Sequence, residues 1–274
     1  MTADRPTAGS GSGGGEPAGD AELDAARMPF LEHLRELRDR VRNAVIAFFV
    51  AFVLCWYFAD DIYAWLRAPL DDTWRSMADK LGPTPTMQFS SVTEPFWVYM
   101  SIGMWAGIFV ASPLIFYQLW RFIAPGLYKR EQQVGVWFSI ASALFFCAGA
   151  AFCYYVVLDS MLHYFLGFAD SSLKPLLSMR EYLDFTRSMM LAFGAVFELP
   201  VLIFFLSAIG LVTHRGLWKF NRWFVVIAFV AAAILTPTPD AVTQAMMAIP
   251  MIVLYNLAIG VAWLNDRRRR RRDT

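Results

Sequence analysis

Hydrophobic residues are gathered into six long runs along the chain, separated by shorter polar stretches. The runs cover residues 43–59, 95–120, 134–158, 188–212, 223–235 and 241–264. Most of them approach or exceed the roughly 20 apolar residues with which an α-helix crosses a hydrocarbon core. Strands of a membrane β-barrel would alternate over about ten residues, and the sequence shows no such alternation. The pattern predicts an all-α, polytopic membrane protein with six transmembrane helices.

The last two runs and the prolines add detail to this fold. The thirteen residues of 223–235 reach only about 20 Å at 1.5 Å per residue, and polar Gln244 interrupts the sixth run. Short spans are accommodated by local thinning of the bilayer. Pro113, Pro200 and Pro250 fall inside runs two, four and six, where each removes a backbone hydrogen bond and bends its helix. We expect a curved, cupped arrangement with short helices five and six.

Charge is distributed unevenly over the gaps between the runs. Bases gather before run one, between runs two and three, between runs four and five, and after run six: Arg35, Arg38, Arg40 and Arg42; Arg121, Lys129 and Arg130; Arg215, Lys219 and Arg222; and residues 267–272. Acids are more frequent in the intervening gap 60–93. By the positive-inside rule, both termini face the cytoplasm, and an even number of spans agrees with this orientation.

Two polar tails flank the membrane domain, which we place at residues 28–264. Residues 1–27 are rich in glycine and serine and partly acidic, and they predict a disordered cytoplasmic tail rather than a signal or transit peptide. Residues 265–274 form a basic cytoplasmic tail. Its six arginines are compatible with nucleic-acid or anionic-lipid binding, but beside a span a topology anchor is the simpler explanation, and we expect no nucleic-acid partner.

Two connecting segments have helical character of their own. Residues 29–41 place Leu34 and Leu37 on an apolar face and Glu36 and Arg40, a favourable i,i+4 pair, on a charged one. This pattern predicts an amphipathic helix on the cytoplasmic surface before the first span. The gap 60–93 is long enough to hold short helices.

Three carboxylates are candidates for function. Glu198 lies deep inside the fourth run, where a charge is expensive and indicates either a functional site or a protonated side chain bonded to a neighbouring helix. Glu131 is the acid of a basic connection, and it either recognises a ligand or favours the start of the third helix through the helix dipole. Asp240 lies in a tight turn and is expected to cap the sixth helix.

Enzyme signatures are absent from the sequence. It has no GxSxG, HExxH or P-loop motif, and neither its histidines nor its cysteines have metal-ligand spacing. We expect no cofactor, no metal and no enzymatic activity. The residues concerned are His33, His163 and His214, and Cys55, Cys147 and Cys153.

Seven strings in one order over residues 28–264 give a specific resemblance. They are HLRELRDR at 33–40, APL at 68–70, TEPF at 93–96, SPLIFYQLWRFIAPGLYKRE at 112–131, FELP at 197–200, TPTPD at 236–240 and AIPM at 248–251. Together they resemble the TatC family, the receptor and core subunit of the twin-arginine protein translocase. The family fold has six helices, a cupped shape, short final helices and both termini in the cytoplasm.

The resemblance implies a signal-peptide site on the cytoplasmic face. Glu36 and Glu131 would engage the paired arginines of a folded substrate's signal peptide, because a guanidinium presents a planar fork to a carboxylate that lysine cannot copy. The same surface would be shaped by Arg38, Phe122, Pro125, Tyr128 and Lys129.

The resemblance also implies roles elsewhere in the chain. Glu198 would face the concave side and contact partner subunits and the inserted signal peptide. The positions that match the family in the outer half, which we expect to organise the loops, are Pro69, Glu94, Asp240 and Gln244.

The implied function is export of folded proteins across the bacterial cytoplasmic membrane, driven by the proton-motive force. The implied partners are twin-arginine signal peptides, TatA- and TatB-like single-span subunits, further copies of this chain and the lipid bilayer. A proton-coupled secondary transporter that uses Glu198 is the alternative. Such carriers often have inverted repeats and several midplane polar groups, whereas here one carboxylate stands nearly alone.

Overall fold

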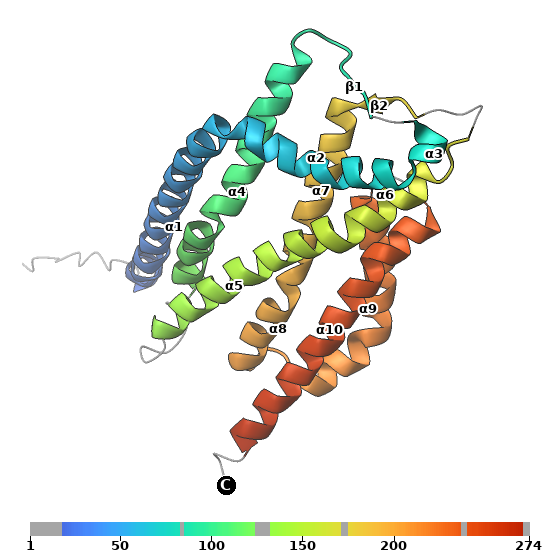
Figure 1. The fold of residues 1–274 in the computed structure, drawn as a ribbon. Coiled ribbons are helices and arrows are strands. Elements are labelled where there is room, and N and C mark those ends of the chain that lie inside the picture. The colour runs from blue at the N-terminus through green and yellow to red at the C-terminus, as the bar shows by residue number, and fades with distance from the viewer. Residues whose placement is uncertain (1–17, 83–84, 124–131, 171–174, 237–239, 271–274) are drawn as a thin grey trace, which may run out of the picture.

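The fold is almost entirely helical (Figure 1). It is a computed structural model that describes residues 18–82, 85–123, 132–170, 175–236 and 240–270. Six helices are long and apolar enough to cross a membrane. The predicted all-α membrane protein with six spans is therefore confirmed.

The six spans are built from nine helical segments. Spans one and two are α1 (Ala18–Tyr57) and α4 (Glu94–Ile123), and spans five and six are α9 (His214–Leu235) and α10 (Ala241–Arg270). Span three joins α5 (Gln132–Phe152), a π-helix η2 (Cys153–Val157) and α6 (Leu158–Leu166). Span four joins α7 (Met179–Phe197) and α8 (Leu199–Ala208).

The gap between the first two spans holds short elements, as expected. They are α2 (Ala59–Ser76), α3 (Ala78–Leu81) and a two-residue strand β1 (Met87–Gln88). β1 pairs in parallel with β2 (Leu177–Ser178), with Met87 opposite Leu177. This pairing connects the segment before span two to the start of span four.

The prediction of a separate surface helix at 29–41 is wrong. Those residues belong to α1, which continues without a break to Tyr57, because no glycine or proline separates them from the first span and arginine and leucine favour a helix. The helix bounds also differ at the two tails. α1 begins at Ala18, within 1–27, and α10 ends at Arg270, within 265–274. The remainder of both tails lies outside the described residues.

Span five begins earlier than its apolar run. α9 starts at His214 and has 22 residues, because its first two turns carry bases that the hydrophobic pattern excluded. The apolar part of α10 that could cross a membrane, Ala241–Trp263, has 23 residues. Spans five and six are nevertheless the shortest of the six, as predicted. Local thinning of the bilayer remains a prediction.

The three prolines act differently. Pro200 coincides with a break in span four, since α7 ends at Phe197 and α8 begins at Leu199. Pro113 and Pro250 lie inside unbroken helices. The amide that Pro113 lacks would have bonded the carbonyl of Phe109, and the Ser112 hydroxyl donates to that carbonyl at 2.7 Å instead. A side chain thus satisfies the backbone group that the proline leaves free.

The helices form a curved wall in which α1 and the α9–α10 pair lie at opposite sides (Figure 1). Contacts run along it from α1 to α4, α4 to α5, α5 to α7, α8 to α10 and α10 to α9. α2 crosses one end of the wall, and the start of α1 and the end of α10 lie at the other. We call these the α2 end and the termini end. The main apolar core lies between them and includes fully buried Leu70, Met161, Met189, Phe193 and Met247.

Candidate functional site

Close packing of α1 on α4 fixes the geometry of the termini end. A Cβ added to Gly103 would lie 2.8 Å from the Cβ of Trp56, and one added to Gly107 would lie 3.0 Å from the Cα of Phe52. Only glycine permits this approach, which is the role of small residues at membrane helix interfaces. The two helices are therefore held nearly backbone to backbone.

An aromatic contact joins the same two helices nearer the termini end. The His33 imidazole of α1 stacks on the Phe122 ring of α4, with 4.4 Å between ring centroids and 14° between the planes. Glu36 lies one turn after His33 on α1. The structure therefore brings Phe122 and Glu36, both predicted site residues, to one surface.

Glu36 is half-buried, and one of its oxygens is already engaged. Oε1 accepts a hydrogen bond from Nη2 of Arg40 at 2.9 Å. Oε2 lies 4.0 Å from Nδ1 of His33, which is beyond hydrogen-bond distance. Because an ionised carboxylate has about four acceptor positions, Glu36 retains room for a further donor.

The other predicted residues of this surface fall into two groups. Arg38 is exposed on α1, with Nη2 3.5 Å from Oδ1 of Asp39. The remaining four lie between the end of α4 and the start of α5, in the segment 124–131 that is outside the described residues: Pro125, Tyr128, Lys129 and Glu131.

Glu198 lies at the break between α7 and α8, where it is both the last cap of one helix and the first of the next. A polar chain from two other spans reaches it. Trp120 donates its indole N–H to the Ser142 hydroxyl at 2.9 Å, and Ser142 is hydrogen-bonded to Glu198. Its Oε1 is buried and has no hydrogen-bond partner within the described part of the chain. The carboxyl group is thus bonded to a neighbouring helix and still has acceptor capacity.

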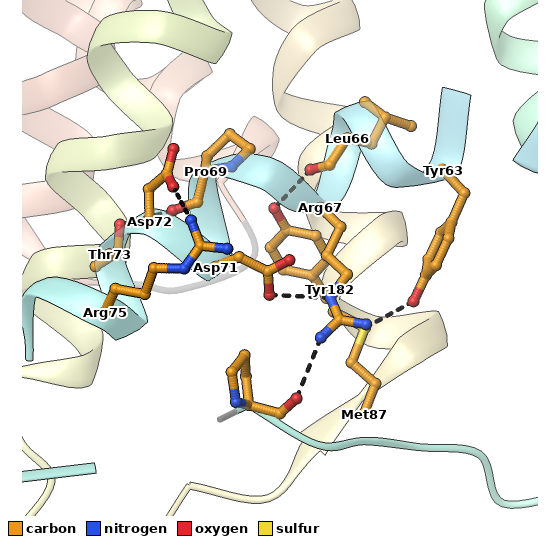
Figure 2. Close-up of polar contacts among 11 residues, drawn as sticks. Tyr63, Leu66, Arg67, Pro69, Asp71, Asp72, Thr73, Arg75, Met87 and Tyr182 are labelled. Atoms are coloured by element: carbon orange, nitrogen blue, oxygen red, sulfur yellow. Dashed lines mark hydrogen bonds and ion pairs between the residues drawn. The ribbon is translucent and has the colours of Figure 1, made fainter. Parts of the chain in front are cut away.

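At the α2 end, Pro69 creates a free carbonyl that a distant residue satisfies. The missing amide of Pro69 leaves the carbonyl of Trp65 without its helical partner, and the Tyr154 hydroxyl donates to it at 2.6 Å. The two aromatic rings stack at 4.1 Å. One position further along α2, the hydroxyl of Tyr182 donates to the carbonyl of Leu66 at 2.8 Å (Figure 2). Pro69 therefore ties α2 to the third span, and its neighbour ties α2 to the fourth.

Arg67 connects α2 to the following loop. Figure 2 shows its guanidinium between the Asp71 carboxylate, at 3.0 Å from Nε, and the carbonyl of Pro85, at 3.1 Å from Nη2. Partial burial lowers the pKa of Arg67, but the hydrogen bond and charge of Asp71, with a contribution from Tyr63, raise the pKa above its usual value overall. The arginine remains charged, and the loop is fixed to α2.

The remaining predicted positions at this end organise helix starts. Glu94 is the first residue of α4, and its Oε2 accepts the backbone N–H of Ser90 at 2.7 Å. Asp240 precedes α10 and accepts the backbone N–H of Thr243 at 2.8 Å, as expected of a cap. Gln244 lies in the first turn of α10, where its N–H donates to the Asp240 carbonyl at 3.1 Å.

Sequence reasoning missed a charged cluster in span four. It placed the start of this span at residue 188, whereas α7 begins at Met179 and carries Arg180, Asp184 and Arg187 within the helix. Their spacing of three and four residues, which puts side chains on one helical face, was the signal that a hydrophobicity count could not use. Glu198 is therefore not the sole charged residue of this span.

Comparison with known proteins agrees with this architecture. Residues 32–250 match the family of the Sec-independent protein translocase protein (TatC). The chain belongs to the TatC family. It is 40% identical over 233 residues to TatC of Desulforapulum autotrophicum, covering 85% of this chain and 83% of that protein. It is 36% identical to TatC of Aquifex aeolicus, covering 89% of this chain and 98% of that protein.

A solved structure of the family shares the fold. The crystal structure of a twin-arginine translocase receptor TatC superposes with a TM-score of 0.73 at 36% identity, covering 85% of this chain and 98% of that chain. The match supports a multi-pass membrane protein with the cupped arrangement of the TatC family.

Proposed function

We propose that this protein is the twin-arginine signal-peptide receptor and core subunit of a translocase that exports folded proteins. The observation that carries the proposal is Glu36, a half-buried carboxylate with one oxygen still able to accept, beside the stacked pair of His33 and Phe122. Membership of the TatC family gives the class of ligand that such a carboxylate would take.

The chemistry favours arginine over lysine at this place. A guanidinium donates two parallel N–H bonds to a carboxylate and stays charged, whereas an ammonium acts as a single point charge. At Glu36 an incoming guanidinium would bond Oε2 while Arg40 keeps Oε1. Glu131 would supply a second carboxylate for the second arginine.

The proposed orientation places the termini end in the cytoplasm of a bacterial cell, with the protein in the inner membrane. The described ends of α1 and α10 lie on the same side of the wall, and bases flank that side. The α2 end would face outward, where Pro69, Glu94, Asp240 and Gln244 organise the loops. We assign no catalytic step to this chain, and transport would draw on the proton-motive force.

The proposed partners are single-span TatA- and TatB-like subunits and further copies of the chain. Glu198 would contact such a subunit, because its Oε1 retains acceptor capacity at a break in span four. A polar group of a partner helix would gain more from this bond inside the bilayer than in water.

Complementation tests the proposal. The chain is expressed with its partner subunits in an export-deficient bacterium, and a reporter with a paired-arginine signal is compared with the same reporter carrying paired lysines. Export of the arginine reporter alone supports the receptor function. Equal export of both, or export of neither by stably inserted protein, would contradict it.

A further inference from the structure

An apolar cavity with a charged rim lies between three spans near the α2 end. Its volume is about 670 Å³, and its walls come from α1, α4 and α7. Phe49 and Phe52 of α1 and Trp97 and Met104 of α4 supply apolar surface. Its charged lining consists of the α7 residues Arg180, Asp184 and Arg187, two cations and one anion, which gives a formal charge of +1.

Asp184 is shared by the two arginines and cannot neutralise both. Its Oδ1 lies 3.0 Å from Nη2 of Arg187, and its Oδ2 lies 3.7 Å from Nε of Arg180. One positive charge therefore remains at the rim. A surplus charge beside hydrocarbon is costly unless an opposite charge approaches it.

Arg187 is positioned by groups on span two and keeps donors available. Its Nη1 donates to the Ser101 hydroxyl at 2.6 Å, and its guanidinium carbon lies 5.2 Å from the centroid of the Trp105 ring. Its Nε is buried, and no residue in the described ranges accepts from it. Of five N–H groups, at least three are left for an acceptor from outside the chain.

A second apolar cavity adjoins the same arginine. It has a volume of about 450 Å³, and Arg187 and Ser101 line both cavities. Its other walls include Trp105, Phe109 and Met190. Arg187 is thus a cationic group between two apolar spaces that are large enough to hold parts of acyl chains.

The depth of Arg187 in the membrane suits a lipid headgroup. The span Met179–Ala208 has 30 residues and is about 45 Å long, so a centred 30 Å hydrocarbon core begins about 7 Å from its start. Arg187 is eight residues from Met179, about 12 Å along the helix, and so about 5 Å inside the core. Arginine bridges such a distance by extending toward the interface. Arg180 lies at the interface itself.

We propose that this cavity binds one anionic phospholipid, with its phosphate at Arg187 and Arg180 and an acyl chain against Phe52 and Trp97. The surplus charge selects the anionic headgroup, and the apolar walls select the chain. A zwitterionic lipid carries its own cation, which the arginines repel. A free phosphate would satisfy the guanidinium but leave the apolar walls without a partner.

Native mass spectrometry of the purified full-length protein tests the site. The protein is exchanged into detergent containing equal amounts of phosphatidylglycerol and phosphatidylcholine with identical acyl chains, and retained lipids are counted. We expect wild-type protein to retain phosphatidylglycerol about fivefold over phosphatidylcholine per arginine engaged. Arg187→Gln should abolish most of this preference, whereas Arg75→Gln, an exposed arginine paired with Asp72 on α2, should keep it.

A gain-of-charge variant keeps the test decisive if Arg187→Gln is unstable. Asp184→Asn raises the formal charge of the rim to +2 and should increase retention of phosphatidylglycerol, whereas Asp72→Asn should not. Equal retention of the two lipids by wild-type protein would overturn the proposal, as would unchanged retention in Arg187→Gln or reduced retention in Asp184→Asn. Displacement of the lipid by millimolar inorganic phosphate would also overturn it, because the apolar contacts would then contribute nothing.

Discussion

The two ends of the helical wall are held by different kinds of contact. At the termini end, the ion pair of Glu36 joins residues four apart on one helix. At the α2 end, the bonds from Tyr154 and Tyr182 join residues 89 and 116 positions apart, and both acceptors are backbone carbonyls. One end therefore carries charges on the surface of a single helix, and the other is a network between spans.

This difference separates a surface that can change partners from a scaffold that cannot. A guanidinium from another molecule can bind Glu36 without moving a helix, since only side-chain contacts within α1 are involved. Removing a donor at the α2 end instead leaves a buried carbonyl unsatisfied, which costs about 1–3 kcal/mol. Mutations at the two ends should therefore affect different measurements, binding at the first and stability at the second.

The largest effect is expected from Glu36→Ala. It should weaken binding of a paired-arginine signal peptide by about 10- to 100-fold, which is the loss of a hydrogen-bonded charge pair, without changing the free energy of unfolding. Crosslinking of a labelled signal peptide in membranes measures this. Glu32→Ala, at an exposed acid one turn earlier on α1, is the matched control. Equal crosslinking in both variants would remove Glu36 from the site.

Gly103→Ala should affect both measurements, because it separates α1 from α4. The added methyl group would lie 2.8 Å from the Cβ of Trp56, and overpacking of this kind lowers the free energy of unfolding by about 1–3 kcal/mol. Detergent-induced unfolding followed by tryptophan fluorescence reports the change. Gly260→Ala in α10, where nothing lies within 4 Å, should be neutral or slightly stabilising. If the two variants were equally stable, the close approach would have no energetic role.

Tyr154→Phe should lower the free energy of unfolding by about 1–2 kcal/mol, because the Trp65 carbonyl loses its donor. In a Pro69→Ala background the loss should shrink, since the new amide can bond the same carbonyl. A double-mutant cycle measures this coupling directly. Tyr155→Phe, at the exposed neighbouring residue, serves as the control. Strict additivity of the two changes would show that Pro69 and Tyr154 do not share that carbonyl.

The smallest effect is expected at the cap of α10. Asp240→Ala removes the acceptor for the Thr243 amide and should lower the free energy of unfolding by about 1 kcal/mol, while Asp240→Ser, which keeps a capping oxygen, should recover most of it. Signal-peptide crosslinking should be unchanged in both. A loss of crosslinking would mean that the α2 end acts on the binding surface as well.

Hydrophobic patterning predicted the spans well where charge and depth agree. Runs two, three and six lie within α4, the third span and α10, because apolar side chains there face either lipid or the core. The shortness of spans five and six also followed from the pattern. For the site, the resemblance named Glu36 and Phe122, and the structure brings both to one surface through the His33 stack.

Features that depend on three-dimensional packing could not be predicted in this way. The start of span four was placed at residue 188 because Arg180, Asp184 and Arg187 look like a loop to a hydrophobicity count, although arginine can lie inside a helix and extend its charge to the interface. The extent of α1 was missed because an amphipathic segment and an apolar one can form a single continuous helix. The partner of the carbonyl freed by Pro69 is fixed only when the third span packs on α2.

The π-helix in span three has a consequence for how the sequence can vary. Residues Cys153–Val157 take one residue more in their turn than an α-helix would, and Tyr154, which bonds the Trp65 carbonyl, is one of them. Deleting one residue here would restore the α-helical repeat but rotate everything beyond it by about 100°. Leu158, Met161 and Leu162, now in the core, would turn toward lipid. This span should therefore tolerate substitutions but not changes of length.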